Sequence, residues 1–173
     1  MKKFFYHFIL KKIIPHKLRI LLKPLYYFFL EFLPLDKYTQ TLVTSTLVNK
    51  KPIIIYLPVL EWKWFFQRPQ HLLKEFSKYG VTCVFCTPSL NYNESGFRKI
   101  QENLYLCDNV RYLKDINNTV VYLTSVNCFK YLKLFKEKFI FYDYVDDLAV
   151  FGEARDLKKR HQSLIKQADI ITA

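Results

Sequence analysis

The sequence predicts an α/β fold, a parallel sheet with flanking helices, preceded by a basic amphipathic helical segment. Short runs rich in β-branched and aromatic residues alternate with stretches of helical spacing between residues 52 and 173. The strand-like runs are nearly continuous in apolar residues, as expected for strands that are covered on both faces. Strands that alternate with helices pair in parallel through right-handed crossovers. The 173-residue chain therefore has room for one such domain and a smaller N-terminal segment.

The N-terminal segment, residues 1–38, is strongly basic. Up to Lys37 it carries eight lysines and arginines against two carboxylates, interleaved with Phe, Tyr, Ile and Leu. Lys11, Lys12 and Lys23 interrupt its apolar runs, so no stretch reaches the roughly 18 to 20 apolar residues that a membrane span needs. We expect interfacial helices on an anionic membrane surface, at the cytoplasmic face of the cell membrane. A helical hairpin packed on the rest of the protein is the alternative.

The first part of the domain holds a strand, a helix and a strand. Residues 39–51 are polar and Thr-rich, which predicts a linker or a weak strand, and Ile53–Leu57 follows as a buried strand. A helix is expected over Pro69–Tyr79, because Pro69 suits a first helical position and Gly80 follows the end. Its apolar stripe comprises Leu72, Leu73 and Phe76. The next strands are Val81–Cys86 and a short one at Leu104–Leu106.

The second part repeats the alternation. Strand Val120–Thr124 precedes a helix that Asn127 is expected to cap, with Tyr131, Leu132 and Phe135 on its buried face. Strand Phe139–Tyr144 precedes a helix over residues 156–167. That helix is expected to bury four residues, Leu157, Leu164, Ile165 and Ala168. A final strand, Ile170–Thr172, runs to the last residue, so the chain resembles an interrupted protein rather than a finished one.

The amino-acid composition excludes some classes of protein. A hydrophobic fraction of 51% and an aromatic fraction of 18% exclude a disordered chain. The net charge of +12 is compatible with nucleic acid, but no nucleic-acid-binding motif is present. The four cysteines lie in or beside expected strands and helices and lack the spacing of a zinc site, so we expect buried, reduced thiols and no metal.

Two segments carry candidate binding chemistry, each directly after a buried strand. Asp143, Asp146 and Asp147 follow one strand, where unpaired burial would be costly, so this strand end should reach solvent. The carboxyl edge of an open parallel sheet is where ligands bind. The carboxylates could accept hydrogen bonds from hydroxyl groups, and Asp143 or Asp146 could act as a general base. Alternatively, Asp146 or Asp147 caps a following turn.

The second segment is Gln67-Arg68-Pro69-Gln70-His71, which opens the helix after the first strand. The N–H groups and dipole of a helix N-terminus attract anions, and arginine adds a planar fork suited to phosphate. Arg68 could instead pair with an aspartate and fix the loop. His71 is either a hydrogen-bonding group of the site or a residue that orders the loop. Trp62 could stack on a ligand or pack in the core.

Three motifs together resemble the N-terminal half of bacterial GT-B glycosyltransferases of the group 1, or family 4-like, class. They are Gln67-Arg68-Pro69-Gln70-His71-Leu72, Tyr142-Asp143-Tyr144-Val145-Asp146-Asp147 and Gln167-Ala168-Asp169-Ile170-Ile171-Thr172-Ala173. The resemblance covers roughly residues 51–173 and implies a Rossmann-like acceptor-side domain over residues 52–173. A donor-binding second domain is not in the sequence. Many relatives carry a glycine-rich loop after the first strand, where this chain has Val59-Leu60-Glu61-Trp62.

The resemblance implies transfer of a sugar from a nucleotide-sugar donor to a membrane-associated glycan or lipid-linked acceptor, in cell-surface polysaccharide biosynthesis. It implies no cofactor. Asp143 and Asp146 are then the catalytic candidates. The substrate-binding candidates are Trp62, Gln67, Arg68, Gln70, His71 and Asp147. The half-enzyme would be inactive alone and could need a separate C-terminal half. The alternative is a non-catalytic membrane- or partner-binding module left by truncation.

Overall fold

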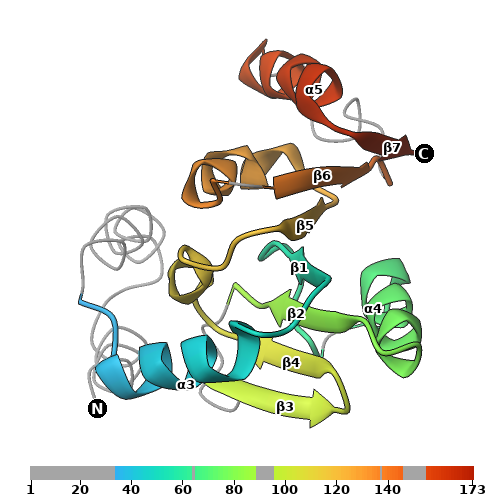
Figure 1. The fold of residues 1–173 in the computed structure, drawn as a ribbon. Helices are drawn as coiled ribbons and strands as arrows, with labels where there is room; N and C mark the ends of the chain where they lie inside the picture. Colours follow the sequence, from blue (N-terminus) through green and yellow to red (C-terminus); the bar gives the residue numbers. More distant parts are fainter. Residues whose placement is uncertain (1–33, 64, 89–95, 137, 146–154) are drawn as a thin grey trace, which may run out of the picture. The chain divides into compact units, whose positions relative to one another are not determined.

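A computed structural model describes residues 34–63, 65–88, 96–136, 138–145 and 155–173. These residues form a seven-stranded sheet in the order β3-β4-β2-β1-β5-β6-β7, which runs from β3 to β7 up Figure 1. All neighbours pair in parallel except β3 and β4, which are antiparallel. The strands are β1 Ile53–Tyr56, β2 Thr82–Cys86, β3 Phe97–Gln101, β4 Leu104–Cys107, β5 Thr119–Leu123, β6 Lys138–Asp143 and β7 Ile170–Thr172.

The predicted α/β fold class is confirmed, and its strand order is Rossmann-like. The three α-helices of the described residues are α3 Lys37–Leu47, α4 Arg68–Lys78 and α5 Arg155–Gln167. Two 3₁₀ helices, η2 Val110–Leu113 and η3 Val126–Leu134, follow β4 and β5. The helices expected over residues 69–79 and 156–167 are α4 and α5, each within one residue of the expected bounds.

The predicted linker over residues 39–51 is wrong for most of its length, because α3 occupies it. Val43 and Leu47, one helical turn apart, are fully buried, and Gln40 Nε2 donates to the Tyr112 carbonyl at 3.1 Å. Threonine lowers helix propensity only slightly, so a packed apolar face stabilises the helix despite four threonines.

Strand β3 was not expected. It lies at the edge of the sheet, and its charged residues Arg98 and Lys99 obscure the strand pattern, although charge is a common way to protect an edge. Phe97 stacks on Tyr105 of β4 with ring centroids 5.2 Å apart. The turn between the two strands contains Asn103 at φ +57°, a left-handed conformation that asparagine tolerates.

Two details of the later helices differ from expectation. Ser125, rather than Asn127, caps η3, because the Ser125 Oγ accepts a hydrogen bond from the Asn127 N–H at 3.3 Å. On α5, Leu164 is fully buried as expected, but Ile165 is 45% exposed and does not belong to the core. Sequence spacing alone cannot show how wide the buried stripe of a helix is.

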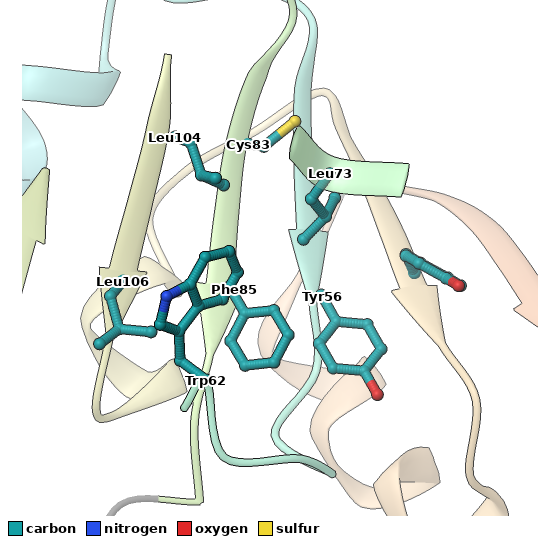
Figure 2. Close-up of a cluster of buried hydrophobic side chains, with 8 residues drawn as sticks. Tyr56, Trp62, Leu73, Cys83, Phe85, Leu104 and Leu106 are labelled. Atoms are coloured by element: carbon teal, nitrogen blue, oxygen red, sulfur yellow. The ribbon is translucent and has the colours of Figure 1, made fainter. Parts of the chain in front are cut away.

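One face of the sheet carries an aromatic core, drawn in Figure 2. Phe85 contacts both Tyr56 and Trp62, with ring centroids 4.8 and 5.1 Å apart. Leu73 brings α4 onto this face, so that helix is anchored beside the carboxyl end of β1. Fully burying a side chain of this size stabilises the fold by roughly 1.5 to 3 kcal/mol. The core therefore holds α4, and with it the residues at its N-terminus, in a defined position.

The chain divides after Asp36 into two units, of which Lys37–Ala173 contains the sheet. The interfacial helices expected over residues 1–38 lie almost entirely outside the described residues. No described helix combines the length and the apolar character that crossing a membrane requires.

Candidate functional site

A cavity of about 310 Å³ lies where the strand order of the sheet reverses. From β1 the chain proceeds to β2 and β4 on one side, whereas β5, β6 and β7 continue on the other. The crevice at such a point, at the carboxyl ends of the strands, is the general ligand site of open α/β sheets. The lining residues are Val59, Leu60, Gln67, Arg68, Pro69, Thr124, Ser125, Val126, Asn127, Tyr142, Tyr144, Val145 and Leu157.

The N-terminus of α4 is ordered by the side chain of Gln70. Its Oε1 accepts a hydrogen bond from the Gln67 N–H at 3.1 Å. Its Nε2 donates to the Phe65 carbonyl at 3.3 Å and reaches the Glu61 carbonyl at 3.5 Å. Gln70 is fully buried, so it holds the loop before α4 and does not face the cavity. Gln67 and Arg68 do line the cavity.

Arg68 forms an ion pair with Asp143 across the strand ends. Arg68 Nη1 donates to Asp143 Oδ1 at 2.7 Å, although the two residues are 75 positions apart. The arginine side chain is 48% exposed and the aspartate 1% exposed. Of the two residues, Arg68 lines the cavity and Asp143 lies behind it. The topology thus brings together one residue from each of the two predicted segments.

Asp143 accepts three hydrogen bonds from protein donors. Its Oδ1 also accepts a hydrogen bond from Thr172 Oγ1 at 2.8 Å, and its Oδ2 accepts one from the Tyr122 hydroxyl at 2.8 Å. Burial raises the pKa of Tyr122, and the hydrogen bond to Asp143 raises it further, so this phenol remains a donor. A buried carboxylate with three donors is suited to orient Arg68.

A second wall of the cavity is aromatic. Tyr142 and Tyr144 line the cavity, and both contact His161 of α5. The Tyr142 hydroxyl and His161 Nδ1 are 2.9 Å apart, within hydrogen-bonding distance. Burial, with a smaller contribution from Tyr144, raises the pKa of Tyr142 to about 12.

The segment after β5 supplies polar groups that were not predicted as site residues. Thr124, Ser125 and Asn127 all line the cavity. The Thr124 hydroxyl is 2.9 Å from the Tyr56 hydroxyl, which fixes its position. The sequence signal for these residues was their place directly after a buried strand, the same signal that marked the aspartates after β6.

The remaining predicted residues lie elsewhere. Trp62 is 7% exposed and packs edge-on against Phe85, so it belongs to the core and does not line the cavity. His71 is exposed, and its ring contacts that of Phe66 at 5.3 Å, away from the cavity lining. Asp146 and Asp147 lie outside the described residues.

The cysteines are all buried and free, as expected for reduced core thiols. Burial raises the pKa values of Cys83 and Cys128 to about 12, so these thiols stay protonated at neutral pH. Within the described part of the chain, no group of three or more His, Cys, Asp or Glu side chains could hold a metal ion.

Comparisons of this chain with protein-family models, with curated proteins and with solved structures find no match.

Proposed function

We propose that the domain is the acceptor-side half of a GT-B glycosyltransferase. It would help transfer a sugar from a nucleotide-sugar to a membrane-associated glycan or lipid-linked acceptor in cell-surface polysaccharide biosynthesis. The observation that carries this proposal is the placement of Arg68, held by Asp143, at a cavity on the carboxyl edge of the sheet. The nucleotide-sugar donor and a lipid-linked acceptor both combine phosphate groups with hydroxyl groups.

Arg68 supplies the phosphate-binding group in this proposal. A guanidinium has five N–H donors, and the bond to Asp143 occupies one of its nitrogens, Nη1. The other donors can bind phosphate oxygens, assisted by the positive end of the α4 dipole. Gln67, Thr124 and Asn127 would bind hydroxyl groups of the same ligand.

The role of general base is assigned to Asp146 rather than Asp143. Asp143 is buried and accepts three hydrogen bonds from protein donors, so it is a positioning residue for Arg68. Asp146 directly follows Val145, which lines the cavity, and Asp147 comes next. We assign ligand contacts to neither Gln70 nor Trp62, because both are buried in structural roles.

The location and the partners follow from the same proposal. The basic segment 1–38 would hold the domain on the anionic inner face of the cell membrane, where lipid-linked acceptors are found. Catalysis would require a second, donor-binding domain that closes over the cavity and excludes water.

The test is genetic complementation, because the cell supplies any second half of the enzyme. The gene is deleted in the source organism and surface polysaccharide is quantified after restoring the wild type, Arg68→Ala, Asp146→Asn or Lys78→Gln. We expect polysaccharide to be lost on deletion and restored by the wild type and Lys78→Gln, which changes only an exposed ion pair with Glu75. Arg68→Ala and Asp146→Asn should fail to restore it.

Two results would count against the proposal. Unchanged polysaccharide in the deletion strain would remove its basis. Full restoration by both Arg68→Ala and Asp146→Asn would favour the non-catalytic membrane- or partner-binding module.

A further inference from the structure

Three consecutive residues at the end of β6 organise the cavity: Asp143 holds the cation Arg68 of α4, and Tyr142 and Tyr144 form the aromatic wall. Side chains alternate along a strand, so Asp143 faces Arg68 and Tyr122, whereas Tyr142 faces His161 of α5. Tyr144 follows and contacts the same histidine, with ring centroids 4.7 Å apart. Arg68 and the two tyrosines line the same cavity.

His161 fixes the aromatic wall from behind. His161 Nδ1 lies within hydrogen-bonding distance of the Tyr142 hydroxyl, and the His161 ring packs against the Tyr144 ring at an interplanar angle of 37°. Tyr142 is only 1% exposed and Tyr144 is half-buried. The two ring centroids are 6.1 Å apart and the rings are tilted by 56°, so Tyr144 is the part of the wall that a ligand can reach and Tyr142 packs behind it.

Besides aliphatic side chains such as Val126 and Leu157, the cavity has four groups that bear an amide or a hydroxyl. Gln67, Thr124, Ser125 and Asn127 come from the N-terminus of α4 and from the segment after β5. A ligand that fits has an anionic group, one apolar face and a rim of hydroxyls. A pyranose phosphate has all three, because its axial C–H groups make an apolar face. The cavity volume of about 310 Å³ is at the small end of the range for ligand sites, which suits a monosaccharide phosphate.

We propose that Tyr144, supported by Tyr142 and positioned by His161, forms a stacking surface for the pyranose ring of a sugar phosphate whose phosphate binds Arg68. The inference rests on the proposed function, since it takes Arg68 as the phosphate site. It adds a substrate class, a ring-bearing sugar phosphate, and a contact residue, Tyr144, that the sequence motifs did not identify as a site residue. His161 acts through the tyrosines and is a positioning residue.

The experiment is an NMR titration of the full chain with four probes. Glucose 1-phosphate carries a pyranose ring, glycerol 3-phosphate carries hydroxyls without a ring, inorganic phosphate carries neither, and uridine monophosphate carries a base. We expect glucose 1-phosphate to bind about tenfold more tightly than glycerol 3-phosphate, with upfield ring-current shifts of its ring C–H protons. Equal affinity of the two, without such shifts, overturns the stacking surface. Ring-current shifts on the base of uridine monophosphate alone would assign the wall to a nucleobase and also overturn the proposal.

Variants separate this inference from the proposed function. Tyr144→Leu should abolish the preference for glucose 1-phosphate but leave the affinity for inorganic phosphate unchanged. Tyr79→Leu is the matched control, because Tyr79 is 84% exposed and lies at the far end of α4. Arg68→Ala should weaken all three simple phosphates about equally. Failure of every phosphate to bind the wild type contradicts the phosphate site itself, whereas binding without ring preference contradicts only the stacking surface.

A positioning role for His161 has its own readout. His161→Ala should lose the ring preference, and His161→Asn, which keeps a hydrogen-bonding group near the Tyr142 hydroxyl, should restore part of it. Thermal unfolding of both variants is measured alongside. Equal ring preference in the wild type and His161→Ala would remove His161 from the proposal.

Discussion

At the scale of single residues, Asp143 determines how Arg68 is presented to the cavity. Its carboxylate accepts hydrogen bonds from a helix, from a neighbouring strand and from the edge strand. An isolated charge could not be buried at 1% exposure, but three donors, one of them the Arg68 cation, make this one stable. The same network that stabilises the strand ends thus fixes the cation.

Asp143→Asn should destabilise the domain by about 2 kcal/mol. The amide cannot accept at both positions, so one buried donor loses its partner, and Arg68 loses its counter-charge. The free energy of unfolding is measured by urea denaturation, with Glu75→Gln as the control. Glu75 forms an exposed ion pair with Lys78, and such pairs contribute roughly 0 to 1 kcal/mol. Equal stabilities of the two variants would contradict the network.

The four thiols offer a second residue-scale prediction. All are buried, so none should react with a disulfide reagent such as dithionitrobenzoate in the native protein at pH 8. All four should react at once in urea. Rapid reaction of one thiol in the native state would show that its strand or helix opens readily.

The sequence predicted Arg68 and Asp143 as site residues, but their pairing depends on the strand order. Residues 75 positions apart meet because β1 and β6 flank β5, which local patterns do not encode. Tyr142 and His161 were missed as site residues for a related reason. Each is spaced like a core residue, and only the tertiary structure shows that the core ends there at a cavity.

At the scale of elements, α3 belongs to the domain although its sequence is typical of a linker. Leu47→Ala should therefore destabilise the domain by about 2 to 5 kcal/mol, the usual loss for a buried leucine. Val48→Ala is the matched control, because Val48 is the next residue and its side chain is 54% exposed. This substitution should change the free energy of unfolding by less than about 0.5 kcal/mol. Urea denaturation compares the two. If Leu47→Ala left the free energy of unfolding unchanged, α3 would be a linker and not part of the folded domain.

Elements with a continuous apolar pattern were predicted well, and those with mixed patterns were not. Strands β1, β2, β5 and β6 are within two residues of their expected bounds, because central strands of a parallel sheet are covered on both faces. Edge strand β3 and helix α3 are half-covered and polar. Their formation depends on packing partners elsewhere in the chain, such as Tyr105 for Phe97.

At the scale of the whole domain, buried phenols make stability sensitive to alkaline pH. Burial raises the pKa values of Tyr56 and Tyr122, and raises that of Tyr142 to about 12, whereas an unfolded tyrosine titrates near 10. Because the folded pKa is the higher one, the contribution to stability is complete below about pH 10. It is lost as the pH rises from about 10 toward 12.

The free energy of unfolding should therefore fall between pH 9.5 and 11.5, by at most about 1.4 kcal/mol per pH unit for each such group. Tyr142→Phe should show a shallower decline, whereas Tyr79→Phe should follow the wild type because Tyr79 is 84% exposed. Identical slopes in all three proteins would mean that Tyr142 titrates normally in the folded state.

Arg68 and Thr172 share a single oxygen atom, Oδ1 of Asp143. Tyr144, on the aromatic wall, donates its backbone N–H to the Thr172 carbonyl at 2.7 Å. We therefore expect the opening of β7 and the occupancy of the cavity to be thermodynamically linked, with a linkage that acts equally in both directions. A ligand that binds Arg68 should slow amide hydrogen exchange at Tyr144 and along Ile170–Thr172. The hydrogen-exchange rates of β7 would then report whether the cavity is occupied, although the ligand does not contact this strand.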